Sequence, residues 1–291
     1  MEFNKIPAID LNETQLKTGH WNVIDKISKK RINLTTKTEK LTNGIVDISS
    51  SLTKSSSGST LTKSKMLELE ALILKEKLNI SEEKAILSYD EVKGALPRLQ
   101  HFYEVFETNL EEEFVNDFLN GRKELRDYLL YNRFVKLITN EKNLAKISKK
   151  DCVLFIGSGP LPITAILLNK FTKCSVDCYD KNNIFANISK RVIENLSLSD
   201  KIKIYNGKGE DLSGKKYSVI IIALLAKPKD KILQNIWNES IKGTKVICRT
   251  TDGIREAFYE KTTPNLFIKY TCTNKVFAKH DQTISSALLI K

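Results

Sequence analysis

The stretch Cys152-Val153-Leu154-Phe155-Ile156-Gly157-Ser158-Gly159-Pro160-Leu161-Pro162-Ile163-Thr164 decides the fold of this 291-residue chain. It opens with five apolar residues, a pattern typical of a buried parallel strand. The glycines that follow permit a tight turn in which a ligand can approach the backbone beside a helix N-terminus. The two prolines suit a helix start, because first-turn N–H groups have no intrahelical partner. The stretch therefore predicts a strand, a glycine turn and a helix, although a tight turn without a ligand is the simpler alternative.

Downstream of this stretch, apolar runs alternate with amphipathic segments. The expected strands are 152–156, 174–179, 202–205, 219–223, 245–249, 266–273 and 284–290, and the expected helices are 182–196, 229–241 and 252–259. This alternation predicts a doubly wound, Rossmann-like α/β domain over residues 149–291. The last two strands are expected to form an antiparallel pair at the sheet edge.

Upstream, two segments of different character precede the α/β domain. Residues 67–148 read as a small helical domain, with Ser81 as a candidate N-cap. Within it, one apolar stripe repeats every three or four residues, as a helix requires: Leu99, Phe102, Phe106, Leu110, Phe114 and Phe118. Residues 1–66 are rich in Ser, Thr and Lys, and we expect a disordered basic tail there.

Composition limits the class of partner. The chain has 47 Lys and Arg against 35 Asp and Glu, a net charge of +12, but no block of five like charges. Residues 1–66 carry a surplus of 5 and the remainder a diffuse surplus of 7, so nucleic acid is not favoured. No apolar run reaches the ~20 residues of a membrane span, and no secretory signal is evident. Five cysteines without CxxC spacing predict reduced thiols and a cytoplasmic location.

Acidic residues follow the second and third expected strands. Asp180 stands about 20 residues after Gly159, the spacing of an acid that binds a ribose diol. Glu210 and Asp211 follow the third strand, where they could hold an adenine edge. A solvated strand-end aspartate and a plain loop are the alternatives. Pro162 replaces the third glycine of a dinucleotide-binding turn, which favours S-adenosylmethionine over NAD.

Four stretches together resemble the nicotianamine synthase family, and the resemblance extends over about residues 95–262. They are Phe155–Thr164, Tyr179-Asp180 with Ala186-Asn187, Ile222-Ala223-Leu224-Leu225-Ala226, and Arg249-Thr250-Thr251-Asp252-Gly253-Ile254-Arg255-Glu256-Ala257-Phe258-Tyr259. The first and the fourth are the specific ones.

The resemblance implies a transferase that moves the 3-amino-3-carboxypropyl group of S-adenosylmethionine onto an amine and releases 5′-methylthioadenosine. Plant-type members repeat the transfer, and bacterial relatives transfer one group to an amino acid, often histidine, in the biosynthesis of opine-type metallophores. The sequence does not identify the acceptor, the number of transfers or the oligomeric state.

The resemblance also implies site residues. Glu107 and Tyr131 would be catalytic, and Glu111, Arg249, Arg255 and Tyr259 would bind the acceptor. The cofactor-binding set would be Gly157, Ser158, Gly159, Pro160, Asp180, Asn182, Glu210, Asp211 and Ala223. Glu107 and Glu111 share a helix face with Phe114 and Phe118. The aromatic stretch of the family retains only Tyr131 here, and Asn182 replaces a second acidic residue.

Simpler readings remain for these residues. The glutamates could form a solvated acidic stripe, Tyr131 could be a core tyrosine, and the arginines could pair with Glu256 or Glu260. No metal site is expected, because the three histidines lie far apart in the sequence.

Two rival functions remain open. One is an S-adenosylmethionine-dependent methyltransferase acting on nucleic acid or a small molecule. However, the segment Ala223–Ala226 after the fourth strand is apolar and lacks the Asn/Asp-Pro-Pro-aromatic motif of base methyltransferases. The other is a binding protein without catalytic activity.

Overall fold

The computed structural model describes residues 36–52 and 60–291. The apolar run Cys152–Ile156 forms strand β1 near the middle of a seven-stranded sheet, in the order β3-β2-β1-β4-β5-β7-β6. The other strands are β2 (Ser175–Asp180), β3 (Ile202–Asn206), β4 (Val219–Ile222), β5 (Lys245–Thr250), β6 (Thr271–Val276) and β7 (Ser285–Ile290). Because the chain order reverses between β1 and β4, a crevice opens at the carboxyl ends of these two strands.

The far edge of the sheet is antiparallel, as predicted. Strand β7 runs antiparallel to both β5 and β6 and lies between them. The strand predicted over residues 266–273 begins later, at Thr271, because Pro264–Phe267 forms a 3-10 turn, η5. Pro264 opens that turn, where a missing N–H costs nothing.

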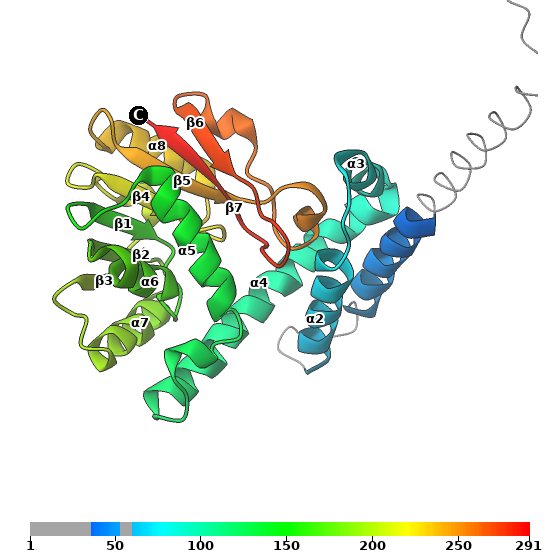
Figure 1. Ribbon diagram of the computed structural model, residues 1–291, viewed down its shortest axis with the longest axis horizontal. Helices are drawn as coiled ribbons and strands as arrows, with labels where there is room; N and C mark the ends of the chain where they lie inside the picture. Colours follow the sequence, from blue (N-terminus) through cyan, green and yellow to red (C-terminus); the bar gives the residue numbers. More distant parts are fainter. Residues whose placement is uncertain (1–35, 53–59) are drawn as a thin grey trace, which may run out of the picture.

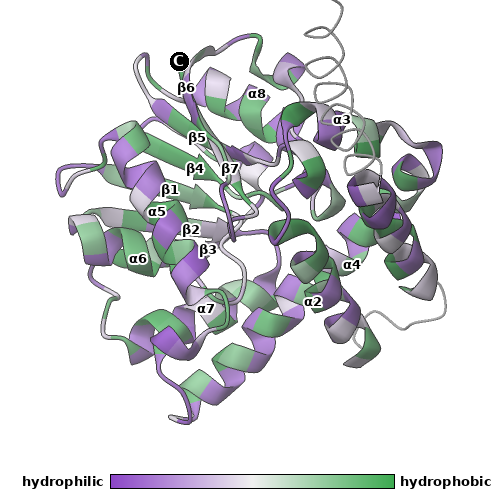
Figure 2. Cartoon of the chain, turned by 45° about the vertical axis from the view of Figure 1, so that its right-hand side comes forward, coloured by the Kyte–Doolittle hydropathy of each residue, from purple (hydrophilic) through white to green (hydrophobic). Residues whose placement is uncertain are grey.

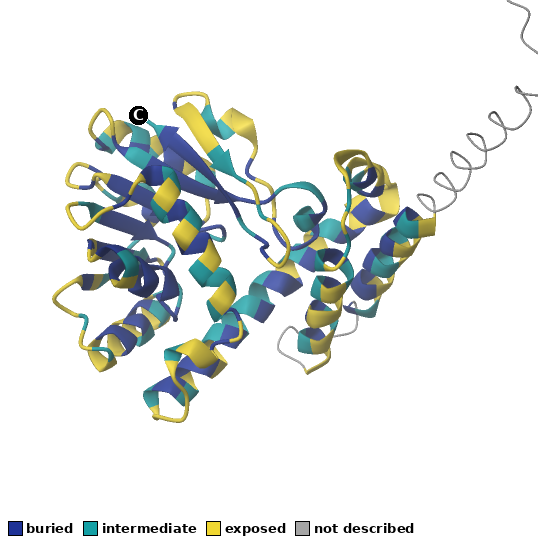
Figure 3. Ribbon diagram, in the orientation of Figure 1, coloured by how far each residue is buried: buried dark blue, intermediate teal, exposed yellow. Residues whose placement is uncertain are grey.

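Helices cover the sheet. They are α5 (Tyr131–Ala145), α6 (Ile163–Thr172), α7 (Asn183–Asn195) and α8 (Lys229–Glu239), with short 3-10 turns η3 (Gly209–Asp211) and η4 (Gly253–Ala257). In Figure 1, α5, α6 and α7 lie in front of the strands. Strand residues such as Ile220, Ile221 and Ile222 are completely buried, so the centre of the sheet is apolar, whereas the edge strand β6 is largely exposed (Figures 2 and 3).

A helical unit stands beside the sheet, and its longest member reaches the sheet. It contains α2 (Thr60–Leu74), α3 (Ile80–Ser88), α4 (Asp90–Leu119) and the 3-10 turn η2 (Leu125–Asp127). The predicted apolar stripe of α4 is buried throughout. The N-cap of α3 is Asn79, and Ser81 lies inside the helix. The Asn79 side chain accepts the N–H of Glu82 at 3.0 Å, and the Glu82 carboxylate accepts the N–H of Asn79 at 2.6 Å.

The prediction of a disordered tail over residues 1–66 is wrong for 36–52 and 60–66; the rest of that tail lies outside the described residues. Residues 36–51 form a helix, and the predicted boundary at residue 66 falls inside α2. The reason is a narrow apolar stripe within a polar segment. Leu41, Ile45, Ile48 and Leu52 follow helical spacing and are at most 3% exposed.

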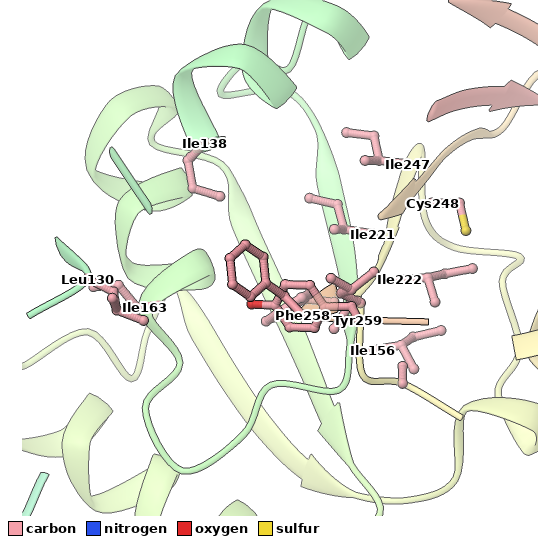
Figure 4. Packing of buried hydrophobic residues seen from close by; sticks show 14 of the residues in the cluster. Leu130, Ile138, Ile156, Ile163, Ile221, Ile222, Ile247, Cys248, Phe258 and Tyr259 are labelled. Atoms are coloured by element: carbon pink, nitrogen blue, oxygen red, sulfur yellow. The ribbon is translucent and has the colours of Figure 1, made fainter. Parts of the chain in front are cut away.

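Turn η4 connects the helical unit to the sheet. The Gln100 side chain of α4 donates to the carbonyl of Glu256 in η4 at 2.7 Å. Phe258 and Tyr259, which follow η4, belong to the same buried cluster as the strand residue Ile156 (Figure 4). The ring of Tyr103 on α4 lies 4.7 Å from that of Phe258.

Within the described residues, no helix combines the length and the apolar character that a bilayer span requires.

Candidate active site

A cavity of about 250 Å³, here called the central cavity, lies at the carboxyl ends of β1, β2 and β4. Its wall includes Glu104, Glu107, Thr108 and Glu111 from α4, Gly157 to Leu161 from the glycine turn, Tyr179 to Asn182 after β2, Ala223 to Lys227 after β4, and also Phe134, Thr164, Gly207, Gly209, Arg249 and Ile284. This is the switch-point crevice in which doubly wound sheets bind ligands. It is closed on one side by α4.

The glycine turn has a conformation that only glycine adopts easily. Gly157 and Gly159 have φ angles of +83° and +66°. A Cβ atom at Gly157 would lie 3.1 Å from the side chains of Ala223 and Ala226, and one at Gly159 would lie 2.7 Å from the carboxylate of Glu111. The turn therefore brings bare backbone to the cavity wall, directly beneath α4.

Asp180, the predicted ribose-binding acid, holds this turn in place. One carboxylate oxygen accepts the N–H of Gly159 at 2.8 Å, and the other accepts the N–H of Asn182 at 2.9 Å. Each oxygen has a further lone pair, so the pair can still accept bonds from two adjacent hydroxyl groups. The hydroxyl of Ser158 is buried in the same wall without a hydrogen-bond partner. The site thus offers acceptors and a hydroxyl that suit a nucleoside.

Glu107 lies one helical turn from Glu111 and forms a short hydrogen bond. The Tyr259 hydroxyl donates to its carboxylate at 2.5 Å. Burial raises the pKa of Glu107 to about 7, although the Tyr259 hydrogen bond and the Arg133 charge oppose the shift. Its remaining accessible surface lies at the wall of the central cavity. A carboxyl group with such a pKa can accept and release a proton near neutrality.

Glu111 has a different environment from Glu107. Its carboxylate accepts the N–H of Leu161 at 3.4 Å and lies against the glycine turn. Burial, followed by the charge of Glu107, holds the pKa of Glu111 well above its usual value. Glu111 therefore faces the glycine-turn side of the cavity, where burial and the charge of Glu107 favour its neutral form.

A polar layer behind Glu107 was not predicted from the sequence. Arg133 of α5 forms a two-fold ion pair with Glu70 of α2, at 2.8 and 3.0 Å. The Tyr103 hydroxyl also donates to Glu70, and the Tyr103 ring meets the Tyr259 ring edge-on at 5.0 Å. This layer supports Tyr259, and through it Glu107.

Arg249 lines the central cavity, but its guanidinium is already paired. Its Nε and Nη2 atoms donate to the two carboxylate oxygens of Glu141 at 2.8 and 2.9 Å, and Nη2 also donates to Thr164. Ser286 donates to the same glutamate at 2.7 Å. Glu141 was missed because 108 residues separate it from Arg249 and no local pattern marks the pair.

Five predicted site residues lie outside the wall of the central cavity; one of them, Tyr259, reaches the site through its hydrogen bond to Glu107. Tyr131 packs against the core at the start of α5, and its hydroxyl accepts from Lys170 at 3.3 Å. Arg255 donates to the backbone carbonyls of residues 280 and 282, at 3.0 and 2.7 Å. Glu210 and Asp211 lie on η3 and do not line the cavity. Backbone at Gly207 and Gly209 borders the cavity in their place.

The sequence profile described as nicotianamine synthase protein matches residues 34–291. A curated relative, the L-histidine 2-aminobutanoyltransferase of Yersinia pestis, is 26% identical over 132 residues. That match covers 45% of this chain and 49% of the relative, so the chain aligns with about half the length of the curated protein it matches.

Solved structures agree with the fold over most of the chain. The crystal structure of a glutamate-to-glutamine variant of MtNAS in complex with S-adenosylmethionine has a TM-score of 0.79, with 25% identity over 86% of this chain and 97% of that one. MtNAS in complex with MTA and tNA has a TM-score of 0.77, with 24% identity over 88% of this chain and 97% of that one.

Proposed function

The chain belongs to the nicotianamine synthase family, and from that premise we propose that it is a transferase of metallophore biosynthesis. It transfers the 3-amino-3-carboxypropyl group of S-adenosylmethionine to the amine of an amino acid and releases 5′-methylthioadenosine. One observation carries this proposal: Glu107, whose pKa is raised to about 7, lines the same cavity as the glycine turn. The name of the Yersinia pestis relative supports the class of reaction.

The reaction requires an uncharged amine. Glu107 accepts a proton from the acceptor ammonium, and Tyr259 holds the carboxylate that does so. The amine lone pair then attacks the methionine-side carbon next to the sulfonium. A new N–C bond forms, the C–S bond breaks, and its electron pair neutralises the sulfur as 5′-methylthioadenosine leaves. The cavity wall between α4 and the glycine turn keeps the reacting atoms in line.

The cavity wall fits S-adenosylmethionine as substrate. Asp180 would accept the ribose hydroxyls, and Gly157, Ser158, Gly159, Pro160, Asn182 and Ala223 would form the surrounding wall. The unpartnered Ser158 hydroxyl and the bare glycine backbone support this assignment. Glu111 would hold the methionine end near the glycine turn. Arg249 would reach the methionine carboxylate with Nη1, the nitrogen that Glu141 does not engage.

The sulfonium itself supplies the leaving group, so we infer that no metal ion takes part in the transfer. Treatment with a chelator should leave the rate unchanged, and a loss of rate that added metal restores would refute this.

Five free cysteines support a cytoplasmic location. The diffuse charge surplus does not favour a nucleic-acid substrate.

The coproduct tests the proposal directly. The purified protein is incubated with S-adenosylmethionine and a panel of amino acids, and the products are identified by mass spectrometry. We expect 5′-methylthioadenosine together with an acceptor that has gained an aminocarboxypropyl group. S-adenosylhomocysteine would instead establish methyl transfer and refute the proposal.

A further inference from the structure

Lys227 stands at the boundary between the central cavity and a second one. The second cavity, here called the outer cavity, has a volume of about 450 Å³ and lies beside η4 and the start of α8. Four residues line both cavities: Glu104, Leu224, Leu225 and Lys227. The Lys227 side chain therefore belongs to the wall that the two cavities share.

The ammonium group of Lys227 is only loosely paired. Its Nζ atom lies 3.8 Å from a carboxylate oxygen of Glu104 and 3.6 Å from one of Glu260, both beyond hydrogen-bond distance. The Lys227 side chain is 47% exposed. It can therefore turn toward a ligand without breaking a close contact.

The other cations near these cavities are committed to the protein itself. Arg249 is held by Glu141, as described above. Lys229, which lines the outer cavity, donates to the carbonyls of Leu224 and Arg249 at 2.8 and 3.0 Å. Lys261 pairs with Glu256 at 2.9 Å. Lys181 lines the central cavity only, and its ammonium donates to the backbone carbonyl of Lys227 at 3.5 Å.

We propose that Lys227 binds the carboxylate of the acceptor, so that the site selects a zwitterionic α-amino acid over a simple amine. The proposal rests on the proposed transfer. Glu104 and Glu107 lie three residues apart on one face of α4, about 5–6 Å between Cβ atoms. Lys227 is next to Glu104, and Glu107 accepts the ammonium proton. The wall thus presents a positive and a negative group at the two ends of a zwitterion.

The reaction requires two bound carboxylates, which supports separate roles for Lys227 and Arg249. S-adenosylmethionine carries one, for which Arg249 is placed, and the acceptor carries the other. Because Arg249 has a single nitrogen outside its ion pair with Glu141, it cannot form a two-fold contact with a second carboxylate. Among the described residues, Lys227 is the cation that lines both cavities, and it is only loosely held.

The test compares an amino acid with the amine that lacks its carboxyl group, for example histidine with histamine. For each protein, the ratio of the two kcat/KM values measures the preference for the carboxylate. A charge-assisted hydrogen bond predicts that Lys227→Gln lowers this ratio by about 10- to 100-fold. Lys261→Gln is the matched control, because Lys261 lines the outer cavity while Glu256 holds its ammonium, and it should preserve the ratio whatever it does to the overall rate. A ratio that stays within threefold in Lys227→Gln overturns the proposal.

Calorimetry separates this proposal from the proposed function. Histidine and histamine are titrated into the wild-type protein and Lys227→Gln in the presence of 5′-methylthioadenosine, where no transfer occurs. We expect wild type to bind histidine more tightly than histamine, and the substitution to remove the difference. Equal binding of both by wild type overturns the role of Lys227. Formation of S-adenosylhomocysteine in the product assay would overturn the transfer alone.

Discussion

Replacing Tyr259 by phenylalanine removes the hydroxyl that donates to Glu107 at 2.5 Å and leaves the ring packing intact. A hydrogen bond to a charged group is worth about 1.5–3 kcal/mol. One pKa unit corresponds to about 1.36 kcal/mol, so loss of this hydrogen bond raises the pKa of Glu107 from about 7 by roughly one to two. The wild-type carboxyl is about half ionised at pH 7, and the variant would be about 1–10% ionised.

The expected result is a displaced pH profile. At saturating substrates and pH 7, release of 5′-methylthioadenosine by Tyr259→Phe should be about 5- to 50-fold slower than by wild type. The deficit should shrink as the pH rises through 8 and 9, because Glu107 then ionises in both proteins. Titration of the acceptor amine is common to both proteins and cancels in their ratio.

A matched control is available in Tyr270, whose buried hydroxyl donates to the carbonyl of Leu233 at 2.7 Å, remote from the cavity. Tyr270→Phe should lose comparable stability and keep the wild-type pH profile. If Tyr259→Phe shows an unshifted profile with a uniformly lower rate, Glu107 is not the group that titrates.

Three further perturbations follow from the structure. Glu107→Gln should abolish most transfer with little change in affinity for S-adenosylmethionine. It should also raise the melting temperature over wild type at pH 8 more than at pH 5. The folded pKa of about 7 exceeds the unfolded value, so wild type loses up to about 3 kcal/mol of stability as the pH rises from 4.5 through 7; an equal difference at both pH values would contradict this. Gly159→Ala must adopt a φ of +66° and approach Glu111, so calorimetry should show at least about tenfold weaker binding of S-adenosylmethionine, and unchanged affinity would remove the turn from the site. Deleting residues 1–65 removes four buried aliphatic side chains, worth about 6–12 kcal/mol, so thermal denaturation should show an unfolded or much less stable protein; a chain that begins at residue 34 is the control, and equal melting temperatures would refute the reasoning.

Local patterns predicted most of the sheet. Strands β1 and β4 are short apolar runs, and β2, β3 and β5 carry apolar residues among polar ones, so the positions of all five could be predicted from nearby residues. Strand β6 was displaced because Leu266 and Phe267 are apolar but follow Pro264 into a turn. The helix over 36–51 was missed because its stripe is narrow and its stabilising contacts come from other helices.

In the candidate site, too, local patterns could be predicted from the sequence, whereas contacts between distant residues could not. That Glu107 and Glu111 lie on the same face of one helix could be predicted, because they are four residues apart in the sequence. The partners that determine their chemistry come from elsewhere: Tyr259 is 152 residues from Glu107 along the chain. Arg255 was expected at the site from the family resemblance and from its charge, but backbone carbonyls bind its guanidinium. Long-range pairing of this kind depends on the assembled fold.

The place of β7 in the sheet has a consequence for the synthesis of the protein. This strand is the last of the sheet to leave the ribosome, yet it lies between β5 and β6. Until it is made, β5 has an open edge, and the Arg249–Glu141 pair lacks the hydroxyl of Ser286. A nascent chain that ends before β7 therefore has an unfinished cavity wall at Arg249, and this part of the wall is completed only when β7 is added.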